Sequence, residues 1–563
     1  MDSLLNSQIF GISSAFVIYL MIMVIIGWRY MKNNASSSDF FLGGRQVGPW
    51  MTALSAEASD MSGWLLMGLP GVAYLGGIKE VFWTALGLAV GTYLNWLFVA
   101  KPLRKCTIAF GDSITIPEFF SNRFKDRSHV LAAISVVFIL FFFTIYTASG
   151  FVACAKLFNS VFGIEYQYGL FIGIAVILLY TIMGGFRAVC ATDFIQGMMM
   201  FIALMASAIM MICLMDGWES AYAKLADFGK NAITGEFGEA MQQKFTANQS
   251  YSVSAIISAM AWGLGYFGMP HILVRFMGIR SNHEIKLSRR IATIWVVIAF
   301  IGAWAVGSFG SVYLYGLNDA HTLLKPELAE TVFSESIKTM FPSFIAGLFL
   351  CGILAAAMST ADSQLLVASS AFSRDIYRAF IHRSASEKTV LNVSRIAVIA
   401  IAVIALFLAL DPKSSIFGLV SYAWAGFGAA FGPIILLSLF WKGITRNGAL
   451  AGMILGGLTV IIWKALPDGL LTLGGIKVFG IYEILPGFLV CLLAAVIVSL
   501  CGIPNDEIVK EFALYREIPD IEDETRSVLI RRVAQVKDDV NKASLMGKIV
   551  RKTVMFLRGN TDD

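Results

Sequence analysis

The sequence predicts an all-α integral membrane protein with about thirteen transmembrane helices, ten of which form two inverted halves of five. Three observations support this prediction. The composition is strongly apolar, apolar runs of about twenty residues recur along the chain, and two of these runs are interrupted at corresponding places. The three helices outside the two halves are one that precedes them and two that follow them in the chain.

The composition excludes an ordinary soluble domain. Hydrophobic residues make up 57% of the chain, charged residues make up 14%, and the mean hydropathy is +0.73, whereas a soluble domain has roughly 25% charged residues. The net charge of +5 is mostly accounted for by loops on one side of the predicted membrane, so it does not indicate a nucleic-acid partner.

The apolar runs give the helices in chain order. The first is too long for a signal-peptide core and is not followed by a small-residue cleavage site, so we expect a retained helix. Loops on one side carry most of the lysines and arginines, which places that side in the cytoplasm, the N-terminus outside and the C-terminus inside. The runs lie at about 9–28, 47–75, 81–100, 130–156, 167–183, 194–215, 252–277, 291–316, 341–371, 389–410, 415–440, 447–465 and 478–501.

The second run contains SAEASDMSGW (55–64), which places Glu57, Asp60 and Gly63 at membrane depth. A charged side chain at the bilayer centre costs roughly 2.5–3.5 kcal/mol on insertion scales, and irregular backbone is tolerated there only around a protein-lined cavity. We therefore predict a broken helix built around a polar ligand.

The seventh run contains WGLGYFGMP (262–270), with three glycines and a proline inside an apolar span. Close helix packing is the alternative to a break. Because five crossings separate the two interrupted runs, an inverted repeat is indicated. The predicted divisions are 1–45 (leading helix and loop), 46–440 (ten-helix core), 441–503 (two trailing helices) and 504–563 (cytoplasmic charged tail).

The ninth run carries small residues at 355–357, followed by Ser359 and Thr360. Small residues let another helix approach closely, while two hydroxyls place oxygen atoms at membrane depth, where a monovalent cation needs oxygen ligands. Alternatively, the hydroxyls bond within their own helix at a plain packing interface. The cysteines and histidines form no metal or protease spacing, so we do not expect an enzyme. The tail is interpreted as one or two surface helices, or as a lipid-surface binder through its basic part.

Five stretches resemble the bacterial sodium/proline symporters of the sodium:solute symporter family. The resemblance covers roughly residues 1–500 and implies a LeuT-type fold, sodium as the coupling ion and L-proline as the substrate. The stretches are SAEASDMSGWLLMGLPG (55–71), FFFTIYTASG (141–150), GGFRAVCATD (184–193), AWGLGYFGMPHILVRFMG (261–278) and ILAAAMSTADSQLLVASSAFSRDIY (353–377).

The resemblance implies a role for named residues. Asp60 would neutralise the ion from a short distance or, alternatively, cap the break; Asp193 would lie near the ion exit path or, alternatively, compensate a helix start. The sodium ligands would be the carbonyls of Ala58, Met61 and Ala356 and the hydroxyls of Ser359 and Thr360. The proline-binding residues would be Trp64, Tyr146, Trp262, Tyr266 and Pro270, for which packing or interface anchoring is the alternative.

Two residues depart from the proline symporter pattern: Glu57 stands in place of glycine, and Met269 in place of glutamine. A carboxylate at Glu57 would pair with the substrate amine, bind a second cation, carry a proton, or simply bond a hydroxyl or an arginine of a neighbouring helix.

The predicted function is sodium-coupled symport of L-proline into the cell by alternating access, in a bacterial inner membrane. The alternatives are another small solute, such as pantothenate, a sugar or another amino acid, and proton coupling. We expect no nucleic-acid partner and no obligate protein partner.

Overall fold

The computed structural model describes residues 2–31, 37–183, 185–228, 252–317, 323–473, 476–502, 506–517, 530–531 and 534–535. These residues are almost entirely helical. Among them, β-structure is confined to one isolated bridge, between Val47 and Ile279, and one antiparallel pair, β1 (Thr472–Leu473) with β2 (Ile476–Lys477). Short 3-10 helices, including η1 (Gly43–Arg45) and η7 (Val478–Gly480), lie in the connections.

Ten helices of the described chain are long and apolar enough to cross a membrane, and a bent pair makes an eleventh span. The two other predicted spans, 47–75 and 167–183, correspond to the broken segment described below and to α9 (Tyr166–Met183). The ten are α1 (Asp2–Met31), α5 (Ile78–Leu94) continued by η3 (Asn95–Val99) and α6 (Ala100–Ala109), α8 (Val130–Phe162), α10 (Phe186–Leu214), α15 (Glu284–Leu317), α17 (Ser343–Ser370) continued by η6 (Ala371–Ile381), α18 (Glu387–Leu408), α19 (Ile416–Phe440), α20 (Arg446–Ala465) and α21 (Ile484–Cys501).

The first predicted break is present. Helix α3 (Pro49–Asp60) ends at Met61, whose φ of −82° and ψ of 63° are not helical. The chain then resumes as a π-helix, η2 (Trp64–Gly68), followed by α4 (Leu69–Gly76). Because a helix leaves the carbonyls of its last turn without partners in the helix, the end of α3 presents main-chain oxygens inside the bundle.

The second predicted break is also present, and its glycines allow close packing at the same time. Helix α13 (Val253–Met260) becomes the 3-10 helix η4 (Ala261–Phe267), and α14 (Pro270–Gly278) follows after a bend of 44°. A Cβ on Gly263 would lie 2.3 Å from the Gly87 carbonyl oxygen of α5, and one on Gly268 would lie 2.2 Å from the Phe427 carbonyl oxygen of α19. The break and the close packing therefore coexist.

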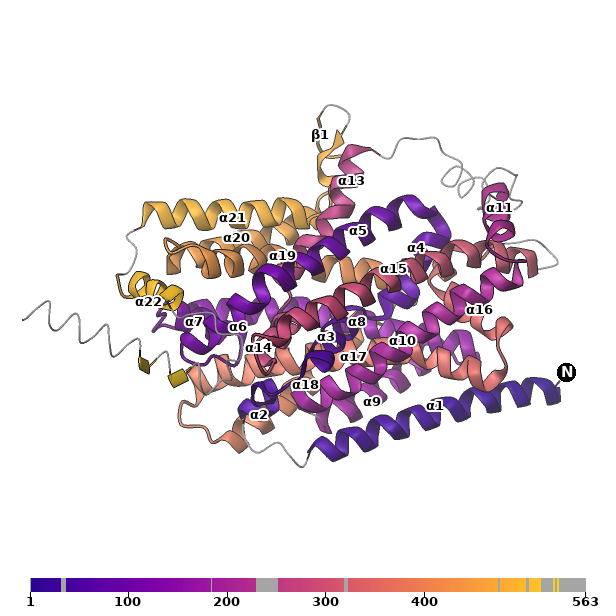
Figure 1. The fold of residues 1–563 in the computed structure, drawn as a ribbon, viewed down its shortest axis with the longest axis horizontal. Helices are drawn as coiled ribbons and strands as arrows, with labels where there is room; N and C mark the ends of the chain where they lie inside the picture. The colour runs from indigo at the N-terminus through magenta and orange to yellow at the C-terminus, as the bar shows by residue number, and fades with distance from the viewer. Residues whose placement is uncertain are drawn as a thin grey trace, which may run out of the picture.

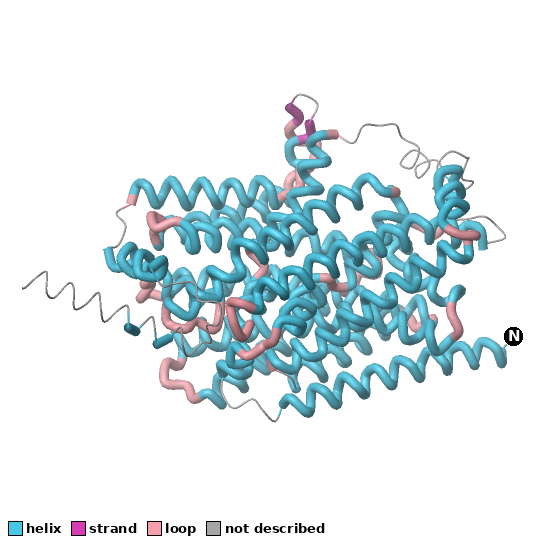
Figure 2. Tube along the Cα trace, in the orientation of Figure 1, coloured by secondary structure: helices cyan, strands magenta, loops and turns pink. Residues whose placement is uncertain are grey.

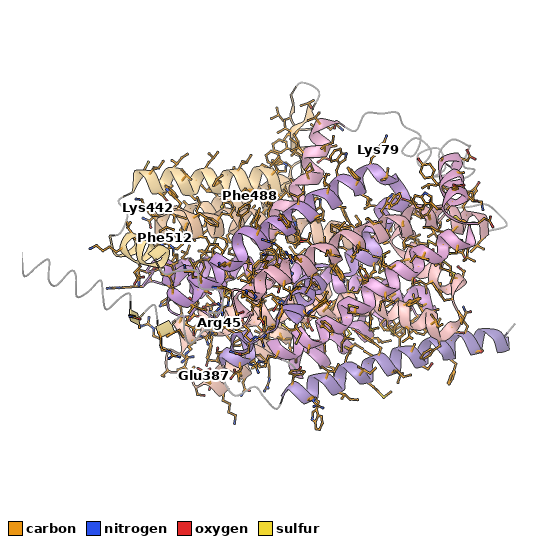
Figure 3. The ribbon with its side chains drawn as sticks, viewed as in Figure 1. Arg45, Lys79, Glu387, Lys442, Phe488 and Phe512 are labelled. Carbon is orange, nitrogen blue, oxygen red and sulfur yellow. The ribbon has the colours of Figure 1, made fainter. Side chains whose placement is uncertain are left out.

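The helices run side by side, with loops gathered towards the two ends of the bundle (Figure 2). Helix α1 lies along one face, and α20 and α21 lie along the opposite face (Figure 1). Arg45, Glu387 and Lys442 lie towards one end, whereas Lys79 lies towards the other (Figure 3). The shorter connecting helices are α2 (Ser37–Leu42), α7 (Ile116–Arg123), α11 (Trp218–Phe228), η5 (Pro326–Thr331) and α16 (Val332–Met340).

The first part of the tail forms a helix, α22 (Asp506–Glu517), that packs on the bundle beside α7 (Figure 1). Phe512 is buried, and the Arg123 guanidinium lies 4.7 Å from its ring centroid. Lys125 and Glu511 form an ion pair at 2.8 Å. Most of the predicted basic stretch lies outside the described residues.

Candidate ion and solute site

The predicted ion site is a cluster of oxygen atoms where the end of α3 meets α17. The Ser359 hydroxyl donates to the carbonyl oxygen of Ala58 at 2.8 Å, and the Thr360 hydroxyl donates to the same oxygen at 3.4 Å. Ser359 also lies 3.2 Å from the Ala356 carbonyl oxygen. All four residues are buried. The donor set of carbonyl and hydroxyl oxygens fits a hard monovalent cation.

Met61, the fifth predicted ligand, lies at the break itself. Its main-chain N–H donates to the Glu57 carbonyl at 2.7 Å, which closes the last turn of α3. Its side chain is fully buried. Met61 thus lies three residues beyond Ala58, where the last turn of α3 gives way to irregular backbone.

Asp60 is the centre of the predicted solute site, because three of the predicted aromatic residues bond to it. The Tyr146 hydroxyl and the Trp64 indole N–H donate to its carbonyl oxygen at 3.0 Å and 3.2 Å. The Tyr266 hydroxyl donates to its carboxylate Oδ2 at 2.7 Å. Oδ1 is buried and has no hydrogen-bond partner among the described residues. Asp60 therefore joins both broken helices and α8.

Trp262 lies in an aromatic cluster beside these residues. Its ring centroid is 6.1 Å from that of Trp64 and 5.1 Å from that of Phe417. The Trp424 indole N–H donates to the Trp262 carbonyl at 2.7 Å, and its ring lies 5.0 Å from that of Tyr266. Aromatic faces that surround a polar centre suit a small apolar ring carrying an ammonium group.

Pro270 occupies the first position of α14, where a missing N–H costs nothing. The next residue, His271, is fully buried, with ring centroids of Phe143 and Tyr146 at 5.6 Å and 6.2 Å. His271 therefore stands at a helix start but inside the bundle, beside the predicted solute site.

Glu57 has a local partner. Its Oε1 accepts from the Trp96 indole N–H at 3.3 Å, and the Trp96 ring packs on Phe276 with centroids 4.5 Å apart. Oε2 is buried and has no hydrogen-bond partner among the described residues. The partner of this carboxylate oxygen is therefore an indole, and not the hydroxyl or arginine that the sequence analysis considered.

Asp193 lies deeper in α10 than the sequence analysis expected. The helix begins at Phe186 and has no acidic residue in its first turn, so compensation of a helix start does not explain Asp193. Its Oδ2 accepts from Arg275 at 3.1 Å and from Ser55 at 2.6 Å. Arg275 also donates to Ser363 and, at 2.8 Å, to the His271 carbonyl. This network joins α3, α10, α14 and α17 next to the oxygen cluster.

A second buried ion pair lies at the other end of the bundle. Lys156 of α8 contacts Glu330 of η5 at 2.6 Å, and Glu330 also accepts from Ser415 and the first amides of α19. An acidic side chain at a helix N-terminus is favourable. The pair ties a connecting segment to α8 and α19.

Sequence reasoning missed Arg275, Trp424 and Glu330 as parts of this region. Arg275 carried a usable signal, because it is a charge inside the seventh apolar span, as Glu57 is inside the second. Trp424 and Glu330 carried none, because their roles depend on helices distant in the sequence.

The model of the sodium:solute symporter family matches residues 40–456. The chain belongs to this family. It is 45% identical over 505 residues to the sodium/proline symporter of Escherichia coli, an alignment that covers 88% of this chain and 95% of the relative. It is 44% identical over 483 residues to the osmoregulated proline transporter OpuE of Bacillus subtilis, covering 86% and 93%.

Among solved structures, the chain is similar to the substrate-bound outward-open state of a Na+-coupled sialic acid symporter. The TM-score is 0.71 at 22% identity, and the match covers 88% of this chain and 98% of that one. This likeness confirms that this chain has the predicted LeuT-type, all-α membrane fold. The protein is thus a multi-pass membrane transporter.

Proposed function

We propose that this family member carries L-proline into the cell together with sodium. The observation that carries the proposal is the meeting of two sites at one break: the oxygen cluster around Ala58 and the aromatic residues bonded to Asp60. The names of relatives at 44–45% identity, which are proline transporters, support the choice of solute.

In the proposed mechanism, sodium lies between the end of α3 and α17 and is held by oxygens of Ala58, Met61, Ala356, Ser359 and Thr360. Binding the ion fixes the position of the break, and Asp60 at its edge orients Tyr146 and Tyr266. The solute then lies among Trp64, Tyr146, Trp262, Tyr266 and Pro270. Ion binding thereby prepares the solute site, which is the coupling that symport requires.

The energetics are sufficient for accumulation. One sodium ion releases about 2.3 kcal/mol per 100 mV and about 1.4 kcal/mol per tenfold gradient. Together these sustain roughly several-hundred-fold accumulation of a neutral solute.

We propose an orientation with the N-terminus outside and the C-terminus in the cytoplasm of a bacterial cell, in the inner membrane. The lysines and arginines in the loops support it. We also propose the division into 1–45, a transport core at 46–440, two trailing helices at 441–503 and a tail at 504–563. As a transporter, the protein would carry its solute without enzymatic chemistry. We place Asp193 and Arg275 along the inner, cytoplasmic part of the ion path.

Uptake of radiolabelled proline into proteoliposomes tests the proposal, with a sodium gradient, a proton gradient or neither imposed. We expect accumulation only with sodium. Accumulation driven by protons would overturn sodium coupling, and no accumulation in any condition would overturn proline. In the second case, sodium-driven uptake of labelled pantothenate, sugars or other amino acids then identifies the solute.

A further inference from the structure

Trp262 is covered by an aromatic residue from outside the proposed transport core. Tyr482 lies just before α21, in the connection from α20, and its ring packs against that of Trp262 with centroids 5.2 Å apart and planes at 30°. Trp262 is 5% exposed. One of the trailing helices thus brings a side chain onto a residue of the proposed solute site.

Two core segments hold Tyr482 in this position. Its hydroxyl donates to the Ser421 carbonyl of α19 at 2.7 Å, and its main-chain N–H donates to the Ser258 hydroxyl of α13 at 3.2 Å. On the side of α20, the Trp463 indole N–H donates to the Ile481 carbonyl at 3.0 Å. The ring therefore bridges the second broken helix and α19, while α20 anchors its loop.

A cavity of about 920 Å³ opens at this point. Trp262, Tyr482, Phe417 and Ser421 line it together with residues of α5, α13 and the α20–α21 connection. Its wall also carries both signs of charge, including Lys464 and Glu483. Such a lining keeps the cavity hydrated and suits the approach of a zwitterion.

We propose that Tyr482 is the outer lid of the solute site, so that the trailing helices contribute to gating. The lid opens when the Tyr482 ring leaves Trp262 and releases the Ser421 carbonyl, which lets the solute pass from the cavity to the aromatic cluster. The inference rests on the proposed function, because it takes Trp262 as a solute-binding residue and the α20–α21 connection as extracellular.

The lid differs from simple packing in what it controls. A packing residue affects the amount of folded protein, whereas a lid sets how often the space beneath it is open. Loss of one typical hydrogen bond changes such an equilibrium about fivefold. Tyr482→Phe removes the bond to Ser421 and keeps the ring, and Tyr482→Ala removes both the bond and the ring.

The first experiment needs no solute. Ser421→Cys, at a residue that is 9% exposed, keeps the carbonyl that accepts from Tyr482 and adds a thiol at the lid. A membrane-impermeant thiol reagent is added outside proteoliposomes, and peptide mass spectrometry follows labelling at residue 421. We expect labelling about fivefold faster with Tyr482→Phe and faster still with Tyr482→Ala. Equal rates in all three proteins would overturn the lid.

Phe479→Ala is the matched control. Phe479 lines the same cavity but packs on Trp463, with centroids 4.7 Å apart. We expect its labelling rate to equal that of the parent Ser421→Cys protein. An equally large increase with Phe479→Ala would mean that any loosening of the loop exposes residue 421, and would overturn a specific role for Tyr482.

The second experiment measures release of bound radiolabelled proline from purified protein with sodium present. We expect Tyr482→Phe to release proline about fivefold faster, with a smaller change in Kd because binding accelerates too. Unchanged release would overturn the lid. Failure of the parent protein to bind proline would instead count against the proposed function, while the labelling result would still decide whether Tyr482 covers residue 421.

Discussion

Arg275 and Asp193 form an ion pair inside the bundle, with Nη2 and Oδ2 3.1 Å apart and side-chain exposures of 1% and 0%. Arg275 belongs to the second broken helix, and Asp193 belongs to α10. Ser55 of the first broken helix bonds to both residues. One pair therefore holds the inner halves of both broken helices against the rest of the bundle.

Breaking this pair is expected to destabilise the protein. Arg275→Ala leaves Asp193 as an uncompensated buried charge, which costs about 3–5 kcal/mol. Arg275→Ala with Asp193→Asn removes both charges and should recover part of that loss. Thermal unfolding of the purified proteins measures both effects. A double variant no more stable than Arg275→Ala would contradict a direct charge interaction.

Ser359→Ala is expected to weaken sodium binding. A contact between a polar group and a charge contributes about 1.5–3 kcal/mol, so the sodium concentration for half-maximal uptake should rise about tenfold or more. Thr360→Ala should have a smaller effect, since its hydroxyl lies 3.4 Å from the Ala58 oxygen, against 2.8 Å for Ser359. Sodium titration of proline uptake measures both values.

Ser370→Ala provides the control for the sodium site. Ser370 lies on the same helix and is buried, and its hydroxyl donates to the Val367 carbonyl of its own turn at 2.8 Å. Its sodium dependence should match the unchanged protein. Normal sodium dependence in both Ser359→Ala and Thr360→Ala, at normal membrane abundance, would remove these hydroxyls from the ion site.

Trp262→Ala is expected to weaken proline binding about twofold to thirtyfold, because it removes an aromatic face worth about 0.5–2 kcal/mol to a cation. Equilibrium binding of radiolabelled proline measures the change. Trp218→Ala on α11 is the control, since Trp218 is 54% exposed and packs on Tyr222 and Phe309. Unchanged proline affinity in Trp262→Ala would refute its role in the solute site.

Glu57→Gln is expected to retain sodium-driven uptake, because the glutamine amide oxygen still accepts from Trp96. Glu57→Gly removes that acceptor and should lower stability by about 1 kcal/mol or more. Uptake under sodium and proton gradients, together with thermal unfolding, compares the two variants. Loss of gradient-driven accumulation in Glu57→Gln, with proline binding intact, would show that the carboxylate takes part in coupling.

The sequence was sufficient for the helices and for the two breaks. Helix α8 begins at Val130, as the apolar run did, and α19 spans Ile416–Phe440 against a predicted 415–440. Such agreement is expected, because a span must be apolar over a fixed length and must satisfy its own backbone. The breaks were visible for the same reason: charges and dense glycines are costly inside a span unless a site needs them.

The partners of the buried charges depend on tertiary structure alone. The sequence placed Asp193 at a helix start and left Glu57 open, whereas the fold pairs Asp193 with Arg275, 82 residues away, and Glu57 with Trp96. It also brings Tyr482 onto Trp262 from a different part of the chain. Local apolar length determines where a helix crosses, but a side chain's partner depends on how distant helices pack, which only the folded bundle decides.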